Sequence, residues 1–432
     1  MEIKDVLFVV SACIQAFIMI YGAYYFVVSM FGWSNRKTNK QPDKNDIHTF
    51  AMIVAAHNEE VVIGEMVKSL KELDYPKEAY DIFVVADNCT DSTADKAREA
   101  GAIVFERSND ELKGKGHALE WMFDKIYNMD KKYDFVSIFD ADNLVNKEFL
   151  TEMNKEINKG YDVVQGSVDS KNPFDTWVTT AYSISFWVVS RLFQNARYNI
   201  NVTCQLSGTG FCVSVPLLKE IGWGATCLTE DMEFTAKLAL MGKKVGWAHK
   251  AVIYDEKPLT FKASWRQRIR WMQGHADVAS RFAGKLFVRA IKKGDLSAFD
   301  CCVYLMQPLK IFVLGIATLI GFFTLFNIPG VSDHIFTYNH LFNLFIKDMD
   351  VAKSFAQVFS ILTMFYIPLV VTYERRVINM KLIWSYLIFG IYTLTWIPIT
   401  IIGWLNKHKT EWSHTEHSRS MSIEEMEQNN KK

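Results

Sequence analysis

The chain has 432 residues, 50% of them apolar, and its 48 basic and 48 acidic side chains give a formal net charge of zero. This composition excludes a disordered chain, a collagen-like repeat and a disulfide-stabilised miniprotein. The lack of a basic excess argues against a dedicated nucleic-acid-binding protein, so no nucleic acid is expected as a partner. The 7 cysteines include no CxxC pair with zinc spacing, and we interpret them as reduced.

Long uncharged apolar blocks flank a charged middle region, which is the pattern of a membrane protein with a soluble domain. The first block, 6–30, exceeds the roughly 20 residues that a spanning helix needs. It ends in a basic stretch and not at a small-residue cleavage site, which favours a retained anchor at 1–35 over a cleaved signal peptide. The basic residues that follow it predict a cytoplasmic domain.

Three further apolar blocks, at 301–328, 354–373 and 382–405, predict transmembrane helices within 301–405. With the anchor they predict a multi-pass protein of the cell membrane, with the lipid bilayer as a partner. Three spans after a cytoplasmic domain place the polar tail, 406–432, outside, although its basic residues favour the cytoplasm. Either the charge rule fails here or one segment is re-entrant. An amphipathic interface segment is expected at 276–300.

Between the first two spans, apolar strand-like runs alternate with amphipathic helical stretches. Strands are expected at 50–56, 81–87, 102–106, 135–142 and 162–167, with helices at 59–73, 92–100 and 116–129. This alternation predicts an α/β domain at 49–275 with a doubly wound, Rossmann-type sheet. Ligands bind at the carboxyl ends of the strands in such sheets, and Asp87, Asp140 and Asp142 lie there.

Asp140 and Asp142 end a hydrophobic strand with one residue between them, which predicts that both face the ligand crevice. Oxygen-only ligands suit Mg²⁺ or Mn²⁺, which complete their shell with substrate phosphates and water. A solvated turn is the alternative. The stretch KGKG at 113–116 suits a diphosphate, through backbone amides and the ammonium group of Lys115, but it lacks the spacing of a P-loop. A solvated basic turn is the alternative there.

Other polar positions begin helical stretches. Asp87 follows a strand and precedes a helix, so it either faces a ligand or belongs to a capping turn. Thr229, Glu230 and Asp231 open a helix, where acids at the favourable end of the dipole are the alternative to a catalytic role. The stretch FKASWRQRIRWMQGH at 261–275 predicts an amphipathic helix at the membrane surface that also serves the ligand site.

Taken in order, HNEE at 57–60, Asp87, DAD at 140–142, TED at 229–231 and QRIRW at 267–271 resemble the family 2 glycosyltransferases that build polysaccharides in membranes. The resemblance covers about residues 50–273 and implies a GT-A-like fold and inverting transfer from a UDP-sugar. The flanking spans are similar to those of cellulose, mixed-linkage β-glucan, hyaluronan, chitin and poly-N-acetylglucosamine synthases. The QxxRW form resembles the processive members, whose acceptor is the growing polysaccharide.

The resemblance also implies roles for individual residues. The implied UDP-sugar-binding residues are Asp87, Asp140, Lys115, Glu59, Gln267 and Arg270. The implied metal ligands are Asp142 and Asp140, and the implied catalytic group is Asp231 as the base, with Glu230 and Thr229 beside it. Trp271 is implied to lie beside the acceptor sugar.

Two departures from these synthases bear on the substrate. SGTGF at 207–211 stands where cellulose synthases carry a Phe-Phe-Cys-Gly-type loop, and TED replaces the GEDR-like sequence of hyaluronan and chitin synthases. We therefore predict processive polymerisation of UDP-glucose into a β-glucan of 1,4 or mixed 1,3 and 1,4 linkage, with translocation of the polymer. The alternatives are a poly-N-acetylglucosamine or other polysaccharide synthase, a non-processive lipid glycosyltransferase, and an inactive scaffold. No motif identifies an export or regulatory partner.

Overall fold

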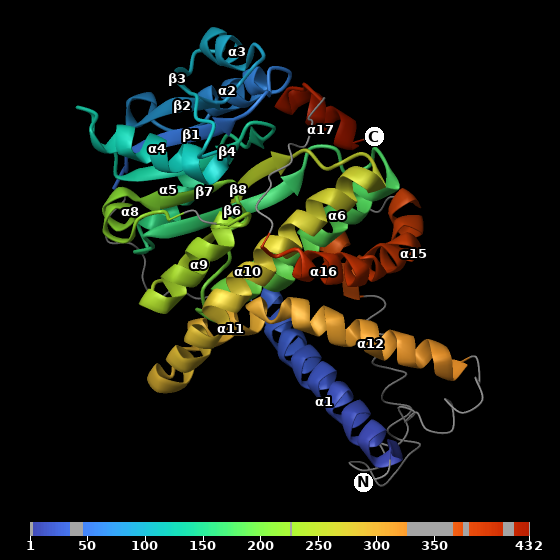
Figure 1. The fold of residues 1–432 in the computed structure, drawn as a ribbon. Helices are drawn as coiled ribbons and strands as arrows, with labels where there is room; N and C mark the ends of the chain where they lie inside the picture. The colour runs from blue at the N-terminus through green and yellow to red at the C-terminus, as the bar shows by residue number, and fades with distance from the viewer. Residues whose placement is uncertain are drawn as a thin grey trace.

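The computed structural model describes residues 3–34, 46–224, 227–325, 366–374, 380–408 and 419–431. A sheet with helices on both faces occupies one end of the molecule, and α1 (Ile3–Met30) and α12 (Gln307–Leu325) extend from the other end (Figure 1). The predicted α/β architecture with additional helical segments is confirmed.

The sheet is mixed, with the strand order β3-β2-β1-β4-β7-β6-β8-β5. Its strands are β1 (Phe50–Ala56), β2 (Tyr80–Asp87), β3 (Ile103–Arg107), β4 (Phe135–Asp140), β5 (Leu144–Val145), β6 (Val163–Ser170), β7 (Phe211–Ser214) and β8 (Val245–Asp255). The first four strands in the spatial order pair in parallel, whereas β7 runs antiparallel to both β4 and β6. The five predicted strands are present, and β5, β7 and β8 are additional.

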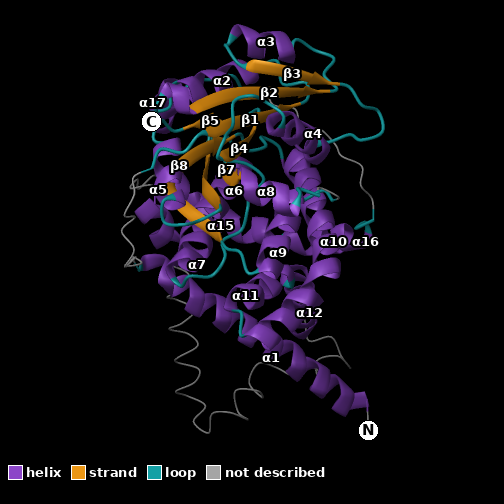
Figure 2. Cartoon of the chain, turned by 90° about the vertical axis from the view of Figure 1, so that its left-hand side faces the viewer, coloured by secondary structure: helices purple, strands orange, loops and turns teal. Residues whose placement is uncertain are grey.

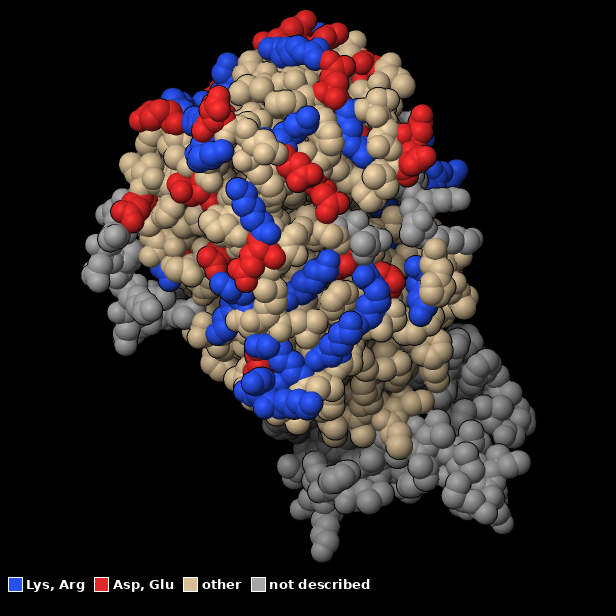
Figure 3. Space-filling model, turned by 60° about the vertical axis from the view of Figure 1, so that its left-hand side comes forward, with Lys and Arg blue, Asp and Glu red and all other residues tan. Residues whose placement is uncertain are grey.

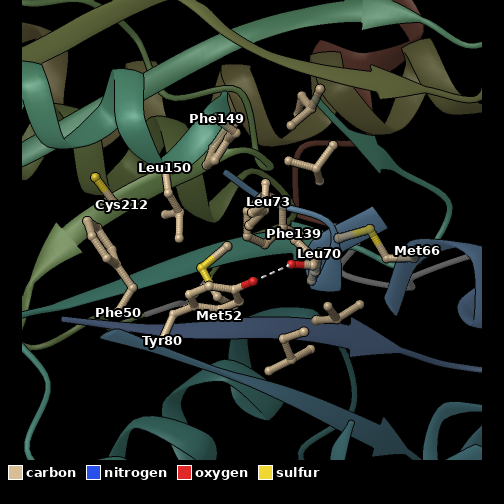
Figure 4. Packing of buried hydrophobic residues seen from close by; sticks show 14 of the residues in the cluster. Phe50, Met52, Met66, Leu70, Leu73, Tyr80, Phe139, Phe149, Leu150 and Cys212 are labelled. Atoms are coloured by element: carbon tan, nitrogen blue, oxygen red, sulfur yellow. Dashed lines mark hydrogen bonds between the residues drawn. The ribbon is translucent and has the colours of Figure 1, made fainter. Parts of the chain in front are cut away.

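The parallel half of the sheet is buried on both faces. Along β1, Phe50 and Met52 enter one hydrophobic cluster, while Ala51 and Ile53 enter the cluster on the opposite face. This two-sided burial explains why the strand sequences are continuously apolar and not alternating. Figure 4 shows part of the first cluster, where the buried hydroxyl of Tyr80 donates to the backbone carbonyl of Leu70 at 3.1 Å.

Helices cover both faces of the sheet and continue towards the apolar segments (Figures 1 and 2). Those of the sheet domain are α2 (Ile63–Lys71), α3 (Thr93–Glu99), α4 (Lys115–Tyr127), α5 (Phe149–Ile157), α6 (Trp177–Val188), α7 (Ala196–Asn199), α8 (Val215–Ile221) and α9 (Glu230–Met241). Those that follow are α10 (Phe261–Lys293), α11 (Leu296–Leu305), α12, α15 (Met380–Leu394), α16 (Trp396–Leu405) and α17 (Ile423–Lys431). A π-helix, η3 (Val189–Asn195), joins α6 to α7, and short 3₁₀ turns lie at η1 (Phe31–Trp33) and η2 (Lys77–Ala79).

The 33-residue helix α10 connects the sheet domain to the apolar helices (Figure 1). Its N-terminus is capped by Thr260, whose side chain accepts from the amide of Ala263 at 3.2 Å. Gly274 allows α10 to pass directly over the start of α9, because a Cβ at this position would lie 2.4 Å from the hydroxyl oxygen of Thr229. The close approach brings QRIRW beside TED.

The apolar segments agree in part with the predicted spans. Within the described ranges, the helical stretches Ala16–Trp33 and Trp384–Leu405 are long and apolar enough to cross a membrane. The predicted span 301–328 is bent: α11 and α12 meet at 44° near Met306, and this bent pair is a third candidate. Most of the predicted span 354–373 lies outside the described residues, and 366–374 is helical.

The C-terminal tail folds back onto the sheet domain (Figure 1). Met421, Ile423 and Met426 form a small hydrophobic cluster with Leu144 of β5. Lys171, which directly follows β6, donates to the backbone carbonyl of Arg419 at 3.2 Å and so joins the tail to the end of that strand. Residues 419–426 of the tail are therefore in direct contact with the sheet domain.

Candidate active site

Parallel pairing places the carboxyl ends of β1, β2 and β4 at one edge of the sheet. Asp87 is the last residue of β2 and Asp140 the last of β4, as the sequence predicted. The loop of SGTGF and the start of α4 lie beside Asp140, since its backbone amide donates to the hydroxyl of Thr209 at 3.0 Å.

Lys115 joins the elements of the site. Its ammonium group, at the start of α4, donates to the carboxylate of Asp140 and, at 2.7 Å, to the backbone carbonyl of Gly208. Gly208 has a φ of +78°, and a Cβ on it would lie 3.6 Å from Oδ2 of Asp231. DAD, KGKG, SGTGF and TED therefore meet at one place.

The TED residues begin α9. Thr229 is the N-cap residue, but its side chain makes no capping hydrogen bond, so a purely capping role is not what the structure shows for it. Glu230 and Asp231 occupy the first turn, where the helix dipole favours acids. Oδ1 of Asp231 accepts from the amide of Met232 at 2.8 Å.

The pKa values of Glu230 and Asp231 lie above those of ordinary carboxylates. Burial, followed by the negative charge of Glu230, raises the pKa of Asp231 to about 7, although Lys115 opposes the shift. Burial also raises the pKa of Glu230. Burial opposes the charged form of Lys115, but Asp140 and Glu230 together raise its pKa. Asp231 can therefore exchange a proton near neutral pH, which a general base requires.

Asp142 lies one residue beyond Asp140 in a buried loop. Its carboxylate accepts from the side-chain amide of Asn143 at 3.2 Å and from the backbone amide of Glu256 at 3.3 Å. Lys171 donates to its backbone carbonyl at 2.8 Å. Among the described residues no group of three or more His, Cys, Asp or Glu could hold a metal ion. Mg²⁺ and Mn²⁺ commonly bind proteins through one or two carboxylates and take their other ligands from substrate phosphates and water.

Asp87 has a buried partner that the sequence analysis missed. The guanidinium of Arg107, at the end of β3, donates to the Asp87 carboxylate, and both side chains are less than a tenth exposed. Arg107 also donates to the backbone carbonyl of Leu112 at 2.6 Å. The available signal was a basic residue directly after the predicted strand 102–106. Glu59 is buried in the loop after β1, where its amide donates to the hydroxyl of Thr93 at 2.7 Å.

The QRIRW residues approach the cluster from α10. Burial lowers the pKa of Arg270, and the charges of Glu230 and Asp140 oppose this shift, so its guanidinium lies in their field. Oε1 of Gln267 accepts from the hydroxyl of Tyr182 at 2.8 Å. The ring of Trp271 lies 6.0 Å from that of Tyr182 in an edge-to-face arrangement.

The structure thus unites six of the predicted residues: Lys115, Asp140, Thr229, Glu230, Asp231 and Arg270. Gln267 and Trp271 lie on the same two turns of α10 as Arg270. Asp87 at the end of β2, and Asp142 and Glu59 in the loops after β4 and β1, lie at the same sheet edge with hydrogen bonds to other partners.

A GT-A-type sheet with acidic strand ends, a cationic loop and a carboxyl that titrates near neutrality defines a glycosyltransferase. Residues 48–274 match the family described as glycosyltransferase like family 2, and the chain belongs to that family. The fold agrees with that of the mannosyltransferase PcManGT from Pyrobaculum calidifontis, solved with GDP-Man and Mn²⁺. That structure has 17% sequence identity and a TM-score of 0.56, over 90% of this chain and 99% of that one.

The chain is similar in sequence to three curated relatives with different names and coverages. The chain is 26% identical over 386 residues to the probable glycosyltransferase YdaM of Bacillus subtilis, covering 85% of this chain and 86% of that protein. It is 28% identical over 235 residues to the beta-monoglucosyldiacylglycerol synthase of Nostoc sp., covering 52% and 48%. It is 24% identical over 271 residues to the poly-beta-1,6-N-acetyl-D-glucosamine synthase of Staphylococcus aureus, covering 60% and 63%. The chain spans about half to two thirds of the last two relatives.

Proposed function

We propose that this protein is a processive, inverting glycosyltransferase that polymerises a UDP-sugar and passes the polymer across the membrane. The observation that carries the proposal is the position of α10. One side of its QRIRW turn places Arg270 in the field of Glu230 and Asp140, and the adjacent Trp271 lies in a cluster of aromatic side chains with Tyr182. Arg270, proposed to stabilise the departing diphosphate, and Trp271, proposed to bind a sugar ring, are therefore consecutive residues of one helix.

The proposed base is Asp231. A carboxylate with a pKa of about 7 can take the proton of the acceptor hydroxyl as that oxygen attacks the anomeric carbon of the donor. Thr229 and Glu230 complete the turn, and Glu230 contributes negative charge that keeps the pKa of Asp231 raised. A Cβ on Gly208 would lie 3.6 Å from Oδ2 of Asp231, so glycine at this position leaves one approach to the carboxylate uncovered for the acceptor.

The donor is proposed to lie along the sheet edge. Asp87, held by Arg107, and Asp140 bind the nucleoside, with the buried Glu59 loop beside them. Lys115, Gln267 and Arg270 stabilise the departing diphosphate with positive charge and hydrogen bonds. Asp140 and Asp142 would hold Mg²⁺ or Mn²⁺, which when bound neutralises charge on the diphosphate.

The acceptor is proposed to stack on Trp271. The indole belongs to a cluster with Tyr182, Tyr392 of α15 and Phe389. Aromatic faces bind sugar rings through their C–H groups, and the partly buried indole of Trp271 is the face proposed to do so here. A processive enzyme needs this, because its product must stay bound while the next donor enters.

The proposed sugar is glucose, giving a β-glucan of 1,4 or mixed 1,3 and 1,4 linkage. The supporting observations are the small SGTGF loop beside the catalytic carboxyl and the relative whose name specifies glucosyl transfer. N-acetylglucosamine polymerisation is the alternative, because another relative is a poly-N-acetylglucosamine synthase.

We also propose a membrane arrangement. Residues 1–35 anchor the cytoplasmic domain at 49–275, and 276–300 lie at the interface, where Phe287, Ile291 (69% exposed) and Leu296 (70% exposed) present apolar surface. Lysine and arginine gather at the lower end of the face in Figure 3, which suits lipid headgroups.

The membrane arrangement must also accommodate the tail. Since the tail touches the catalytic domain, the segment 301–405 crosses the membrane an even number of times in this proposal. α15 and α16 lie against α6 and α10 (Figure 1), so we assign them to the interface.

A second function rests on a specific observation: the match to a beta-monoglucosyldiacylglycerol synthase extends over 235 residues, 52% of this chain. In that case the acceptor is a diacylglycerol and only one sugar is added. The two functions differ in their product. The purified protein in vesicles should be incubated with UDP-glucose or UDP-N-acetylglucosamine and Mn²⁺, and the product analysed for linkage. A polymer digested by β-glucanase supports the proposal, whereas a product that extracts into organic solvent supports the lipid transferase.

A further inference from the structure

We propose that Tyr182 is a positioning residue for the donor: it fixes the side-chain amide of Gln267 so that its amino group is presented to the diphosphate. This inference rests on the proposed function, which assigns Gln267 to the diphosphate. Tyr182 lies on α6, 85 residues before Gln267 in the chain, and no sequence pattern connects the two. Their contact exists only because α6 and α10 pack together.

The hydrogen bond has a defined direction. The hydroxyl of Tyr182 lies 2.8 Å from Oε1 of Gln267 and 3.4 Å from the backbone carbonyl of Ser264, so its proton goes to the nearer oxygen. Gln267 accepts through Oε1, and its Nε2 branch therefore points away from Tyr182. A diphosphate oxygen accepts hydrogen bonds and cannot donate them, so Nε2 is the branch that the donor requires.

Tyr182 is itself held rigidly. It is 2% exposed and lies in the aromatic cluster with Trp271 and Tyr392. The start of its helix is fixed by a reciprocal capping arrangement between Thr176 and Thr179. Burial keeps the pKa of the Tyr182 hydroxyl well above its ordinary value, so the group stays a proton donor throughout the working pH range.

The helix that carries Gln267 is also fixed from a second direction. Arg268, the next residue, is fully buried and donates to the hydroxyl of Thr395 at 2.7 Å, at the junction of α15 and α16. Its guanidinium lies 4.3 Å from the centre of the Tyr392 ring. Successive residues on a helix point about 100° apart. The contacts of Arg268 with Thr395 and Tyr392 therefore limit the rotation of α10 about its axis. The hydrogen bond from Tyr182 then fixes the orientation of the Gln267 side chain.

The test uses the full-length protein in vesicles and the variant Tyr182→Phe, which removes the hydroxyl and keeps the ring beside Trp271. UDP binding with Mn²⁺ should weaken about threefold to tenfold, the effect expected for one neutral hydrogen bond. KM for the UDP-sugar should rise by the same factor, while kcat and polymer length stay nearly constant. Tyr80→Phe is the matched control, because it removes another buried hydroxyl that donates to a backbone carbonyl, inside the hydrophobic core.

A double-mutant comparison separates positioning from simple packing. Gln267→Ala should weaken UDP binding at least as much as Tyr182→Phe, and the double variant should equal Gln267→Ala. Gln267→Glu keeps the acceptor oxygen for Tyr182 but loses the amino group, so it should also weaken UDP binding.

Two outcomes would overturn the positioning role. One is a Tyr182→Phe variant that behaves like Tyr80→Phe, and the other is a double variant whose effects add. Failure of the proposed function is a different result, in which the wild-type protein consumes no UDP-sugar.

Discussion

Replacing Asp231 with Asn should abolish sugar transfer and at the same time stabilise the folded protein. Asn keeps the size and shape of the side chain, but it can neither accept the acceptor's proton nor carry a charge. The carboxylate of Asp231 lies near that of Glu230 in surroundings that disfavour ionisation. Removing the charge therefore relieves both the cost of burying a carboxylate and its repulsion from Glu230.

The size of the stabilisation follows from the pKa of Asp231, which is about 7 in the fold against an ordinary value of 3.8. At about 1.4 kcal/mol per pKa unit, ionised Asp231 lowers the free energy of unfolding by up to about 4 kcal/mol. Partial solvent access reduces this to about 1 to 3 kcal/mol. The folded state binds more protons than the unfolded chain between about pH 4 and 7, so this penalty grows as pH rises through that window.

Thermal unfolding of the detergent-solubilised protein provides the assay. Asp231→Asn should raise Tm clearly at pH 8 and less at pH 5, where the wild-type carboxyl is protonated in the fold. Transfer should fall at least about 100-fold, while UDP binding changes little. Asp95→Asn on α3 is the control, because that side chain is 75% exposed. An equal Tm gain at both pH values, or loss of UDP affinity matching the loss of transfer, would refute the reasoning.

Other variants probe the remaining assignments. Asp142→Asn should raise the Mn²⁺ concentration needed for activity and weaken UDP binding together, since this carboxylate reaches the diphosphate through the cation; unchanged metal dependence would place the ion elsewhere. Trp271→Ala should shorten or abolish the polymer but leave hydrolysis of the donor, measured as free sugar, whereas normal polymer length would leave Trp271 as a membrane anchor. Arg107→Ala should lower Tm and weaken UDP binding, because Asp87 is left buried without its cation; a change in Tm alone would make the pair purely structural.

The part of the fold that the sequence predicts is the part whose elements are long and uniform. β1, β2 and β4 are continuous apolar runs buried on both faces, and such runs stand out in any sequence. β5 has two residues and β7 has four, which is too short for a periodic pattern. β8 is longer, but His249 and Lys250 interrupt its apolar run where it is irregularly paired with β6.

A residue of the candidate site could be predicted from the sequence where its position at the end of a strand already places it at the ligand-binding edge of the sheet. Asp87 and Asp140 end strands, and parallel pairing brings strand ends together without further information. Arg107 and Tyr182 depend instead on contacts between distant segments. Arg107 reaches Asp87 because β3 pairs with β2 in a register that places the two residues opposite each other. That register cannot be read from the sequence, so the pairing of Arg107 with Asp87 could not be predicted.

The meeting of TED with QRIRW illustrates a dependence on one small residue. Gly274 lies where α10 crosses the start of α9, and any side chain there would collide with Thr229. From the sequence, a glycine inside a helical pattern only lowers the expected stability of that helix. In the fold it determines how near the proposed base lies to the residues proposed to bind the diphosphate.

The QRIRW segment admitted two interpretations from its sequence, a helix at the membrane surface and a ligand-binding element, and helical geometry accommodates both. Arg270 faces the acids of the catalytic cluster, whereas Arg268 is buried against Thr395 and the ring of Tyr392, in the helices next to the proposed membrane region. Two arginines separated by one residue therefore serve opposite sides of one helix. α10 therefore links Thr395, at the junction of α15 and α16, to the acidic cluster at the start of α9.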